Sequence, residues 1–478
     1  MARRTKILAT VGPSSDDPRV LAEMIEAGVD VFRIGLAHGS LSDAVQRYRM
    51  IREVAKASGK SIGILADLPG PKVRIGQLPD GGVSLQVGAT IELVPGKETS
   101  TATSLGVDYL DLLRDVQPGD SVALGDGTVR LTICSVDAES AKAEVASGGA
   151  IQGRPGLHIP SDRLGLTTPT AEDLYKLDAF VEEGVDMIAL SFVRSAHDVR
   201  RVGTEPYPRG PLVIAKIETR SAVDNLEGII GAAGAVMVAR GDLGIEMGIE
   251  ELPHLQKRII RECIAQGKPV ITATQMLESM ITNSTPTRAE VSDVANAVFD
   301  GSSVVMLSAE TAIGVDPVNV VATMSRICGH ADDEFDYNGW ATRLREIRLA
   351  SIGDDDMHLT DAMTGAAWRA ATEMGASAII AVSESGFTVR SIARFRPSMP
   401  ILGFSTNART RHQLTLSWGT TPLPASRATD SLDMMNSLVL TARELGHIKS
   451  GDTVAVLAGG GGGSRAKTTD LLRLVRVP

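Results

Sequence analysis

The chain has 478 residues, which predicts about three domains of roughly 150 residues each. Its composition is 43% apolar, and Asp and Glu outnumber Lys and Arg by 58 to 48, giving a formal charge of −10. There is no long basic run, so nucleic acid is not an expected partner, and no run of about 18 apolar residues, so a membrane span is not expected. The three widely spaced cysteines fit neither a disulfide framework nor a zinc site, so we expect a cytoplasmic protein.

Short apolar runs alternate with amphipathic stretches from the start of the chain. The runs are residues 6–11, 30–34, 61–67, 186–191, 212–218, 235–239, 269–274 and 304–308. Stretches such as 19–27 and 252–266 between them have the period of surface helices. Buried parallel strands read as continuous apolar runs because helices cover their outer faces. Eight such repeats predict an α/β protein with a (β/α)8 TIM barrel.

Two further domains are predicted around this barrel. Residues 71–159 are rich in Gly, Val and turn signals, and segments 122–124 and 128–134 read as short antiparallel strands. We expect a small β-barrel lid domain, inserted between the barrel segments 1–70 and 160–335. Residues 336–478 read as a C-terminal α/β regulatory domain. Its expected helices are 362–374 and 389–395, and its expected strands are 378–383, 401–404, 454–457 and 472–477.

Polar residues at the ends of the apolar runs are informative, because strand ends on one rim of a barrel share a cavity. The residues in question are Arg33, Asp67, Lys216, Glu218, Asp242, Thr274 and Ser308. Any one of these charges alone would more often be a solvated residue of the rim. The complete set on one rim favours a functional site.

The strands around residues 212–218 and 235–239 carry the chemistry. Lys216 and Glu218 are two apart and therefore share a face, and Glu218 and Asp242 follow neighbouring strands that lie about 5 Å apart. Two adjacent carboxylates repel unless a cation lies between them, which Mg²⁺ or Mn²⁺ would provide. A nearby Lys and Arg would neutralise a phosphate or an enolate, which suits phosphoryl transfer. The segment from Gly241 is expected to open a short helix whose amides could hold a carboxylate.

The motifs around these residues resemble the pyruvate kinase family over essentially the whole chain. They are 31–34 (VFRI), 37–39 (AHG), 214–218 (IAKIE), 237–244 (MVARGDLG), 272–280 (TATQMLESM), 286–290 (PTRAE) and 306–311 (MLSAET). The resemblance implies transfer of the phosphoryl group of phosphoenolpyruvate to ADP in glycolysis, giving pyruvate and ATP through an enolpyruvate intermediate. It also implies a homotetramer, and an inserted lid that excludes water from the transfer.

Residue roles follow from the same resemblance. It assigns the divalent ion to Glu218 and Asp242, the transferring phosphoryl group to Lys216 and Arg33, and the substrate carboxylate to Thr274 with the amides of Gly241 and Asp242. Thr274 and Ser308 would belong to the region that delivers a proton to the enolate carbon. The remaining expected site residues, His38, Arg74 and Arg154, lie on the nucleotide side. Arg154 is the one basic residue just before Gly156, in the segment that returns from the lid to the barrel.

The sequence departs from the family where most members bind K⁺. Gly35 and Ala37 stand where the family has Asn and Ser ligands, and Leu68 replaces a Thr beside the retained Asp67. A position often occupied by Glu is Lys72. Our hypothesis is that the Lys72 ammonium, facing Asp67, supplies the charge of the missing ion, so that K⁺ is not required. The alternative is that Lys72 is an ordinary surface lysine at the lid hinge.

A turn in the C-terminal domain suits a phosphate. Ser383, Ser385, Gly386 and Thr388 lie between a predicted strand and a predicted helix, where hydroxyls and amides are available. The family uses this loop for sugar-phosphate effectors such as fructose 1,6-bisphosphate, and a glycine run at 459–463 lies near the family's effector loop. A nucleotide effector is equally compatible, and so is the possibility that both segments are ordinary turns.

Two other functions compete with the pyruvate kinase assignment. A Mg²⁺-dependent aldolase acting on a pyruvate enolate would also place Glu and Asp on adjacent strand ends, but it needs neither Lys216 nor a lid. A catalytically weakened, effector-sensing homologue would explain the missing monovalent ligands, but not the retained metal and phosphate residues. An assay for pyruvate formation from phosphoenolpyruvate and ADP separates the three.

Overall fold

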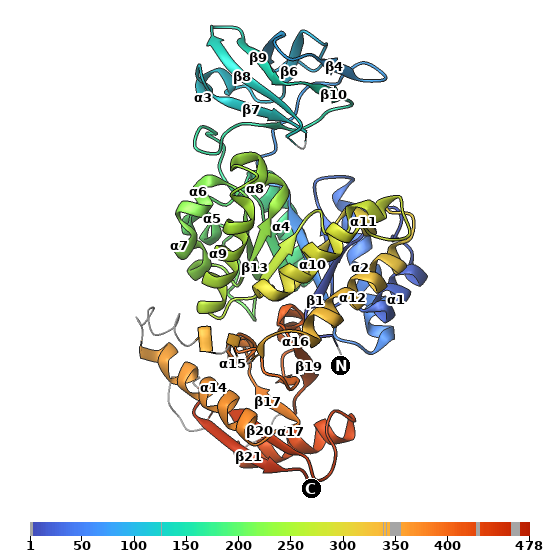
Figure 1. Cartoon of the computed structure of the whole chain (residues 1–478), viewed down its shortest axis with the longest axis vertical. Coiled ribbons are helices and arrows are strands. Elements are labelled where there is room, and N and C mark those ends of the chain that lie inside the picture. The colour runs from blue at the N-terminus through green and yellow to red at the C-terminus, as the bar shows by residue number, and fades with distance from the viewer. Residues whose placement is uncertain are drawn as a thin grey trace.

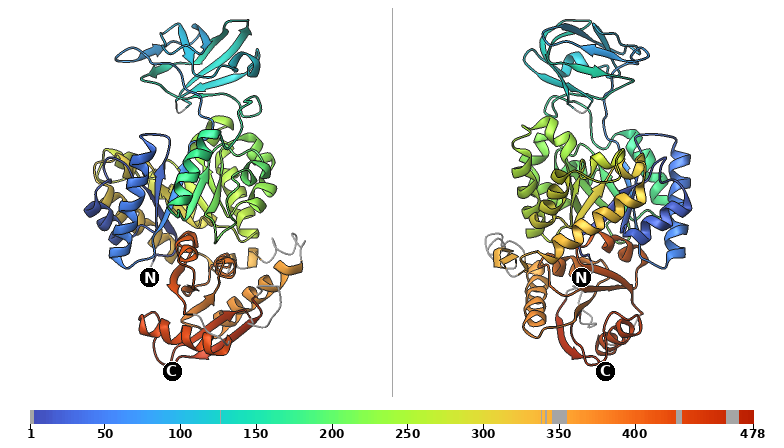
Figure 2. Two further views of the ribbon diagram at one scale, coloured as in Figure 1. Left: turned by 180° about the vertical axis from the view of Figure 1, so that it is seen from behind. Right: turned by 45° about the vertical axis from the view of Figure 1, so that its right-hand side comes forward.

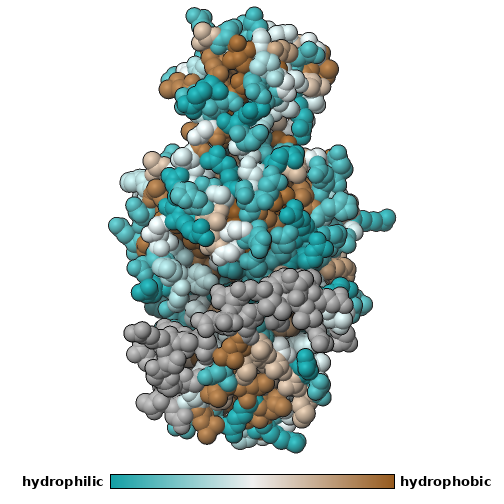
Figure 3. Space-filling model, turned by 90° about the vertical axis from the view of Figure 1, so that its left-hand side faces the viewer, coloured by the Kyte–Doolittle hydropathy of each residue, from teal (hydrophilic) through white to brown (hydrophobic). Residues whose placement is uncertain are grey.

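Three bodies are stacked along the long axis of the computed structural model (Figure 1). The structure describes residues 3–125, 127–337, 339–340, 342–344, 355–426, 431–459 and 469–478. The middle body is the barrel, a smaller β domain lies at one end, and an α/β domain lies at the other. The other ribbon views show the same arrangement (Figure 2), and the space-filling view shows a narrow neck between the β domain and the barrel (Figure 3).

The middle body is a closed barrel of eight parallel strands that follow one another in chain order. The strands are β1 (Lys6–Thr10), β2 (Val31–Gly35), β3 (Gly63–Leu68), β12 (Met187–Leu190), β13 (Leu212–Ile217), β14 (Ala235–Ala239), β15 (Val270–Ala273) and β16 (Val304–Leu307). Each corresponds to a predicted run. Leu8 and Leu65 belong to the core inside the barrel, whereas Ile7 and Phe32 pack outward against the helices. Burial on both faces explains why the runs are continuous rather than alternating.

Helices surround the barrel and begin at recognisable caps. They are α1 (Pro18–Ala27), α2 (Leu41–Ser58), α4 (Ala171–Glu182), α5 (Ala196–Arg200), α6 (Arg220–Asp224), α7 (Leu226–Ala232), α8 (Arg240–Glu246), α9 (Leu252–Ala265), α10 (Arg288–Asp300), α11 (Ala309–Ala312) and α12 (Pro317–Asp333), with the 3₁₀ turn η1 (Glu278–Ile281). Asp17 accepts from the amide of Arg19 before α1, and Thr287 forms a capping box with Glu290 before α10. Both caps satisfy amides that a helix start leaves free.

The inserted domain contains β4 (Val83–Leu85), β5 (Thr90–Pro95), β6 (Ser104–Val107), α3 (Leu112–Asp115), β7 (Ser121–Leu124), β8 (Val129–Val136), β9 (Ala141–Ser147), β10 (Gly149–Ile151) and β11 (Leu157–His158). Its six-stranded sheet runs β11-β7-β8-β9-β5-β6, and β4 pairs with β10. In the described residues the edge strands β11 and β6 do not pair with each other, so the sheet is open and does not form the closed β-barrel that we expected. Only isolated bridges, Ile75 to Val107 and Arg74 to Gly156, span the two sheet edges. This domain has its own core, which includes Ile91 and Leu131.

The C-terminal domain has helices on both faces of one sheet. It contains α14 (Asp355–Glu373), β17 (Ala378–Val382), α15 (Phe387–Ala393), β18 (Ile401–Ser405), α16 (Ala408–Gln413), η2 (Leu414–Leu416), β19 (Thr420–Pro424), α17 (Ser431–Glu444), β20 (Thr453–Ala458) and β21 (Leu471–Arg476). The order is β19-β18-β17-β20-β21, with β21 antiparallel to β20. The predictions omitted α17 and the edge strand β19. The two prolines of β19 argue against a strand, because proline cannot donate a hydrogen bond to a neighbouring strand.

The C-terminal domain closes the barrel end opposite the inserted domain. Leu416 of η2 packs into the core inside the barrel. The buried Asp186 binds His412 of α16 through Nδ1 at 3.0 Å and Arg52 of α2 through Nη2 at 2.5 Å. The open rim of the barrel therefore faces the inserted domain (Figure 1). Within the described part of the chain, no helix has the length and apolar character to span a membrane.

Candidate active site

The carboxyl ends of the barrel strands meet two adjoining pockets beneath the inserted domain. One pocket is lined by His38, Lys72 and Arg74 on one side and by Asp242 on the other. The second is lined by Gly241 and Asp242 of α8 together with Gly127, Thr128 and Arg130 of the inserted domain. Asp242 thus lies where the pockets join, on the helix α8, which lies at the barrel end facing the inserted domain (Figure 1).

The side chain of Lys216 lies at the centre of the charged residues on this rim. Its Nζ is 2.7 Å from Ser191 Oγ, 3.2 Å from Glu218 Oε2 and 3.8 Å from Asp67 Oδ1. Burial alone would lower the pKa of Lys216, but the charges of Asp67, Glu218 and Asp242 outweigh it and raise the pKa. The ammonium is therefore charged and held rigidly, as a group that neutralises a phosphate must be.

Glu218 is a fully buried carboxylate, and one of its two oxygens accepts no hydrogen bond. Its Oε1 accepts the amide of Phe192 at 2.7 Å, a residue with φ 55°, whereas Oε2 has no hydrogen-bond partner. Burial has the largest effect on the pKa of Glu218, Lys216 opposes it and Asp242 adds to it, and together they raise the pKa to about 7. A carboxylate held this way fits a divalent cation, which would relieve its repulsion from Asp242.

No cluster of three or more His, Cys, Asp or Glu side chains suited to a metal occurs in the described residues. The candidate site offers two carboxylates, Glu218 and Asp242. That number is what Mg²⁺ commonly takes from a protein when water and substrate oxygens fill its other positions.

Arg33 is oriented by two neighbouring strands. Its Nε donates to Asp67 Oδ2 at 2.6 Å and its Nη1 to Thr10 Oγ1 at 3.1 Å. Burial would raise the pKa of Asp67, but Lys216 and Arg33 outweigh it, with a smaller contribution from Lys72, and the pKa is lowered. Asp67 thus fixes both cations that are expected to contact a phosphate.

Thr274 occupies a left-handed backbone conformation at the end of β15, with φ 68°. Arg240 holds this turn, because its Nε donates to Ala273 O at 3.2 Å and its Nη2 to Thr274 O at 2.5 Å. Arg240 is in turn paired with Asp293 at 2.8 Å. Thr274 Oγ1 accepts the amide of Gly241 at 3.0 Å, so the predicted carboxylate-binding partners lie together. Strained backbone of this kind persists where surrounding contacts enforce it.

Ser308 lies beyond β16 with a buried hydroxyl. Its amide donates to Glu310 Oε2 at 2.6 Å, and its Oγ has no hydrogen-bond partner among the described residues. Glu310 also accepts the amide of Leu277 at 3.1 Å, which links the segments that follow β15 and β16. The free hydroxyl is available to a ligand or a water molecule.

The predicted nucleotide residues form a cationic flank. Burial and the charges of Arg74, Lys72 and Arg33 lower the pKa of His38, so its ring is neutral at neutral pH. The Arg74 Nη1 donates to Arg154 O at 3.2 Å. The Arg154 guanidinium itself pairs with Asp108 at 3.4 Å within the inserted domain.

Gly35 and Ala37, which stand where the family has monovalent-cation ligands, are not tightly packed. A β-carbon at Gly35 would meet only the Arg33 guanidinium, at an ordinary 3.7 Å, so packing does not require glycine there. Lys72 is exposed and, within the described residues, forms no ion pair with Asp67 in this conformation. It lines the pocket that the lid covers.

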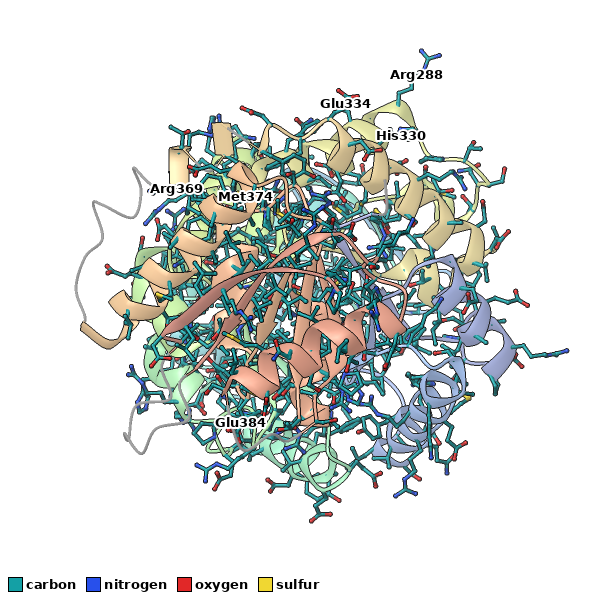
Figure 4. All side chains as sticks on the ribbon, turned by 90° about the horizontal axis from the view of Figure 1, so that it is seen from below. Arg288, His330, Glu334, Arg369, Met374 and Glu384 are labelled. Carbon is teal, nitrogen blue, oxygen red and sulfur yellow. The ribbon has the colours of Figure 1, made fainter. Side chains whose placement is uncertain are left out.

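The predicted effector loop lies in the C-terminal domain, remote from this rim. Gly386 has φ 78° and precedes α15, and the Ser385 Oγ accepts the amide of Phe387 at 3.4 Å. The Thr388 Oγ1 is 2.6 Å from Thr469 Oγ1, and the Ser383 amide is bonded to Phe404 O at 3.0 Å. Glu384 of this loop lies near the periphery (Figure 4). Residues 460–463 of the glycine run lie outside the described residues.

Sequence reasoning missed Thr10, Ser191 and Asp293, which position the site. It included Arg240 and Glu310 in its strand-end motifs but gave them no positioning role. Ser191 ends the fourth apolar run and could have been selected by the rule that selected Thr274. The other roles depend on contacts between distant segments, which no local pattern reveals.

Comparisons with known proteins agree over nearly the whole chain. The family description "Pyruvate kinase, barrel domain" matches residues 2–321, and "Pyruvate kinase, alpha/beta domain" matches residues 361–475. The pyruvate kinase of Corynebacterium glutamicum is 40% identical over 462 residues, covering 96% of this chain and 94% of that protein. The pyruvate kinase of Mycobacterium tuberculosis is 37% identical over 485 residues, covering 100% of this chain and 99% of the relative.

The fold and the rim define a barrel enzyme whose buried cations and paired carboxylates suit phosphoryl transfer. This chain belongs to the pyruvate kinase family. It is accordingly a phosphotransferase, and the predictions of fold class and enzyme class are confirmed.

The raised pKa of Glu218 predicts a pH-dependent stability of the metal-free protein. Because the folded pKa of about 7 exceeds the ordinary value of 4.5, protonated Glu218 stabilises the fold at low pH, and this contribution is lost as the pH rises through about 7. From about pH 5 to about pH 8, the wild type should lose roughly 2–3 kcal/mol of unfolding free energy relative to Glu218→Gln. Denaturant titrations with chelator present measure this.

The exposed Glu227 on α7 provides the control, because Glu227→Gln should leave the wild-type pH profile unchanged. Parallel profiles for the wild type and Glu218→Gln would contradict the assigned burial effect.

Proposed function

We propose that this protein transfers the phosphoryl group of phosphoenolpyruvate to ADP, giving pyruvate and ATP, at the barrel rim beneath the lid. The observation that carries the proposal is the position of the Lys216 ammonium, which lies 3.8 Å from Asp67 Oδ1 and 3.2 Å from Glu218 Oε2, an oxygen that accepts no hydrogen bond. A fixed cation beside two carboxylates is the arrangement expected for charge stabilisation during phosphoryl transfer.

Glu218 and Asp242 would hold Mg²⁺, or Mn²⁺ in its place. When bound, the ion supplies Lewis-acid neutralisation of the substrate's oxygens. The chain's own part is to orient these carboxylates, and the amide of Phe192 does this for Glu218 by donating to its Oε1 at 2.7 Å.

Lys216 and Arg33 bind the phosphoryl group from one side. Their hydrogen bonds to Ser191, Asp67 and Thr10 fix them before substrate arrives, so little reorganisation is needed during transfer. Thr274, with the amides of Gly241 and Asp242, binds the substrate carboxylate opposite them. The Gly241 amide would exchange its bond to Thr274 for the substrate.

The step after transfer protonates the enolate carbon of enolpyruvate. We assign delivery of this proton to the region of Thr274 and Ser308. The hydroxyl of Ser308 is buried and has no hydrogen-bond partner among the described residues. Ketonisation to pyruvate then draws the transfer forward. The buried position of Ser308 keeps the proton path separate from bulk water.

The nucleotide occupies the cationic flank of His38, Arg74 and Arg154, and the inserted domain closes over it. Glu246, at the end of α8, anchors the lid's return segment through His158 Nε2 at 2.8 Å and the Ser161 amide at 2.8 Å. It also accepts the Arg220 amide at 3.1 Å. Lid motion is thereby tied to the helix that carries Asp242.

Removing the Lys216 charge provides the sharpest activity test. Lys216→Met should lower turnover in a coupled assay for pyruvate by at least about 10³-fold, because a charge aimed at the transition state is lost. The exposed Lys56 on α2 offers the matched control, and Lys56→Met should retain wild-type turnover.

Near-normal turnover of a folded Lys216→Met protein would contradict its role. Absence of pyruvate formation by the wild type would instead favour the effector-sensing homologue, and cleavage of an aldol substrate would favour the aldolase.

The monovalent cation is replaced by Lys72 in this proposal. Gly35 and Ala37 offer no side-chain oxygen, and Lys72 precedes the lid, so lid closure can bring its ammonium toward Asp67. The charge of Lys72 contributes to the lowered pKa of Asp67, after the larger effects of Lys216 and Arg33, which supports an electrostatic attraction between the two groups.

Turnover of the wild type should therefore be equal in Na⁺, K⁺ and tetramethylammonium buffers. Lys72→Glu should lower turnover and make it responsive to K⁺, whereas Lys142→Glu on the exposed face of β9 should do neither. Strong activation of the wild type by K⁺ would end this part of the proposal.

Organisation and regulation complete the proposal. We divide the chain into a barrel of residues 1–70 and 160–335, a lid of 71–159 and a regulatory domain of 336–478, in a cytoplasmic homotetramer. The edge strand β21 exposes Leu471 and Leu474, and hydrophobic side chains gather on the C-terminal domain (Figure 3). A sugar-phosphate or nucleotide effector would bind the loop of Ser383, Ser385, Gly386 and Thr388. Sedimentation as a monomer, with and without fructose 1,6-bisphosphate, would contradict the assembly.

A further inference from the structure

We propose that the interface between the barrel and the C-terminal domain contains a binding site for a small inorganic anion of halide size. A cavity lies there between the segment joining α9 to β15 and the C-terminal helix α15. Its polar lining is Lys268 and Ser303 from the barrel and Arg390, Arg394, Arg396, Ser417 and Trp418 from the C-terminal domain. Its free volume is about 20 Å³. One water needs roughly 10–15 Å³, so the space suits a single small ion.

The lining is cationic and includes no carboxylate. Arg394 is paired with Asp361. Lys268, Arg390 and Arg396 donate to backbone carbonyls, of Ala233 at 2.6 Å, Ser385 at 3.0 Å and Ser302 at 2.7 Å, and the Tyr207 hydroxyl also interacts with Arg390.

These three cations have no ion pair with any carboxylate in the part of the chain that the structure describes. The side chains of Arg390 and Arg396 are also almost completely withdrawn from water, at 4% and 2% exposure. A buried charge without a counter-ion is strongly unfavourable.

Aromatic rings compensate this charge only in part. The Arg396 guanidinium lies 4.9 Å from the centroid of Trp418, and that of Arg390 lies 4.9 Å from Tyr207. Such contacts are attractive but carry no net negative charge. Burial lowers the pKa of Arg390 and of Lys268, and the Tyr207 hydroxyl opposes this shift without cancelling it.

Several buried donors around the cavity are also unused. Arg390 Nη1, Ser417 Oγ and Trp418 Nε1 have no hydrogen-bond partner. Two of the three can only donate, and the hydroxyl of Ser417 can also donate. A water molecule could accept from them, but its own protons would need acceptors and the charge would remain. An anion accepts from all three and balances the charge, so it is the occupant that the lining fits.

The position of the site gives it a structural role distinct from the active site and the effector loop. Lys268 lies just before β15, the strand that leads to Thr274. Arg390 belongs to α15, which begins at the effector loop, and its side chain binds Ser385 of that loop. A bound anion would therefore hold the two domains together between the regulatory turn and the catalytic rim.

Bromide diffraction tests the proposal on the unmodified protein. Crystals of the wild type soaked in sodium bromide should give an anomalous peak inside the cavity, within hydrogen-bond distance of Arg390 Nη1. A parallel soak in sodium sulfate should leave the cavity unchanged, because a tetrahedral oxyanion is too large. An absent bromide peak, or sulfate in the cavity, would overturn the assignment to a halide-sized ion.

Melting temperature in solution gives a second readout. Replacing gluconate by chloride at constant ionic strength should raise the melting temperature of the wild type in a saturable way. Lys268→Met and Ser417→Ala should each raise the half-saturating chloride concentration, by about tenfold for the charged group. Arg369→Met, at an exposed position near the periphery on α14 (Figure 4), should match the wild type.

Equal chloride responses in the wild type and both cavity variants would contradict the site. If a cavity variant fails to fold, the bromide experiment on the wild type still decides.

Discussion

The site depends on one interaction, the placement of the Lys216 ammonium among Asp67, Ser191 and Glu218. Burial disfavours the charge, and only the surrounding carboxylates keep the pKa of Lys216 raised. Asp67 comes from β3, Ser191 follows β12, and Glu218 follows β13. Because these are adjacent strands of one closed barrel, the closure of the barrel itself assembles the charge network. Disturbing any of the three strands would misplace a cation that the reaction needs.

The two ends of the barrel have different tasks. At the rim, Glu246 joins the lid's return segment to α8, and Arg240 locks the strained turn at Thr274. At the other end, Asp186 binds both Arg52 and His412, so the C-terminal domain forms the floor of the barrel. The candidate active site and the C-terminal domain are thus separated by the length of the strands, and the rigid strands between them are the physical route for any coupling.

The pattern of apolar residues predicted the barrel, because strands that are buried on both faces appear in the sequence as continuous apolar runs. The same logic located Lys216 and Glu218, whose spacing of two residues fixes a shared face. It could not foresee the left-handed Thr274, since only the contact with Arg240 enforces that conformation. Nor could it foresee the open sheet of the lid, the proline-containing β19, or buried arginines such as Arg390 in a cavity shared by two domains. Each depends on contacts between segments far apart in the chain.

The central claim is that Glu218, Asp242 and Lys216 converge on one divalent cation and one phosphoryl group. A crystal structure with Mn²⁺ and phosphoenolpyruvate tests it most directly. The account predicts a single anomalous manganese peak bonded to one oxygen of each carboxylate at about 2.0–2.2 Å, with Lys216 hydrogen-bonded to the phosphate. Manganese bound elsewhere, or a phosphate beyond the reach of Lys216, would contradict it.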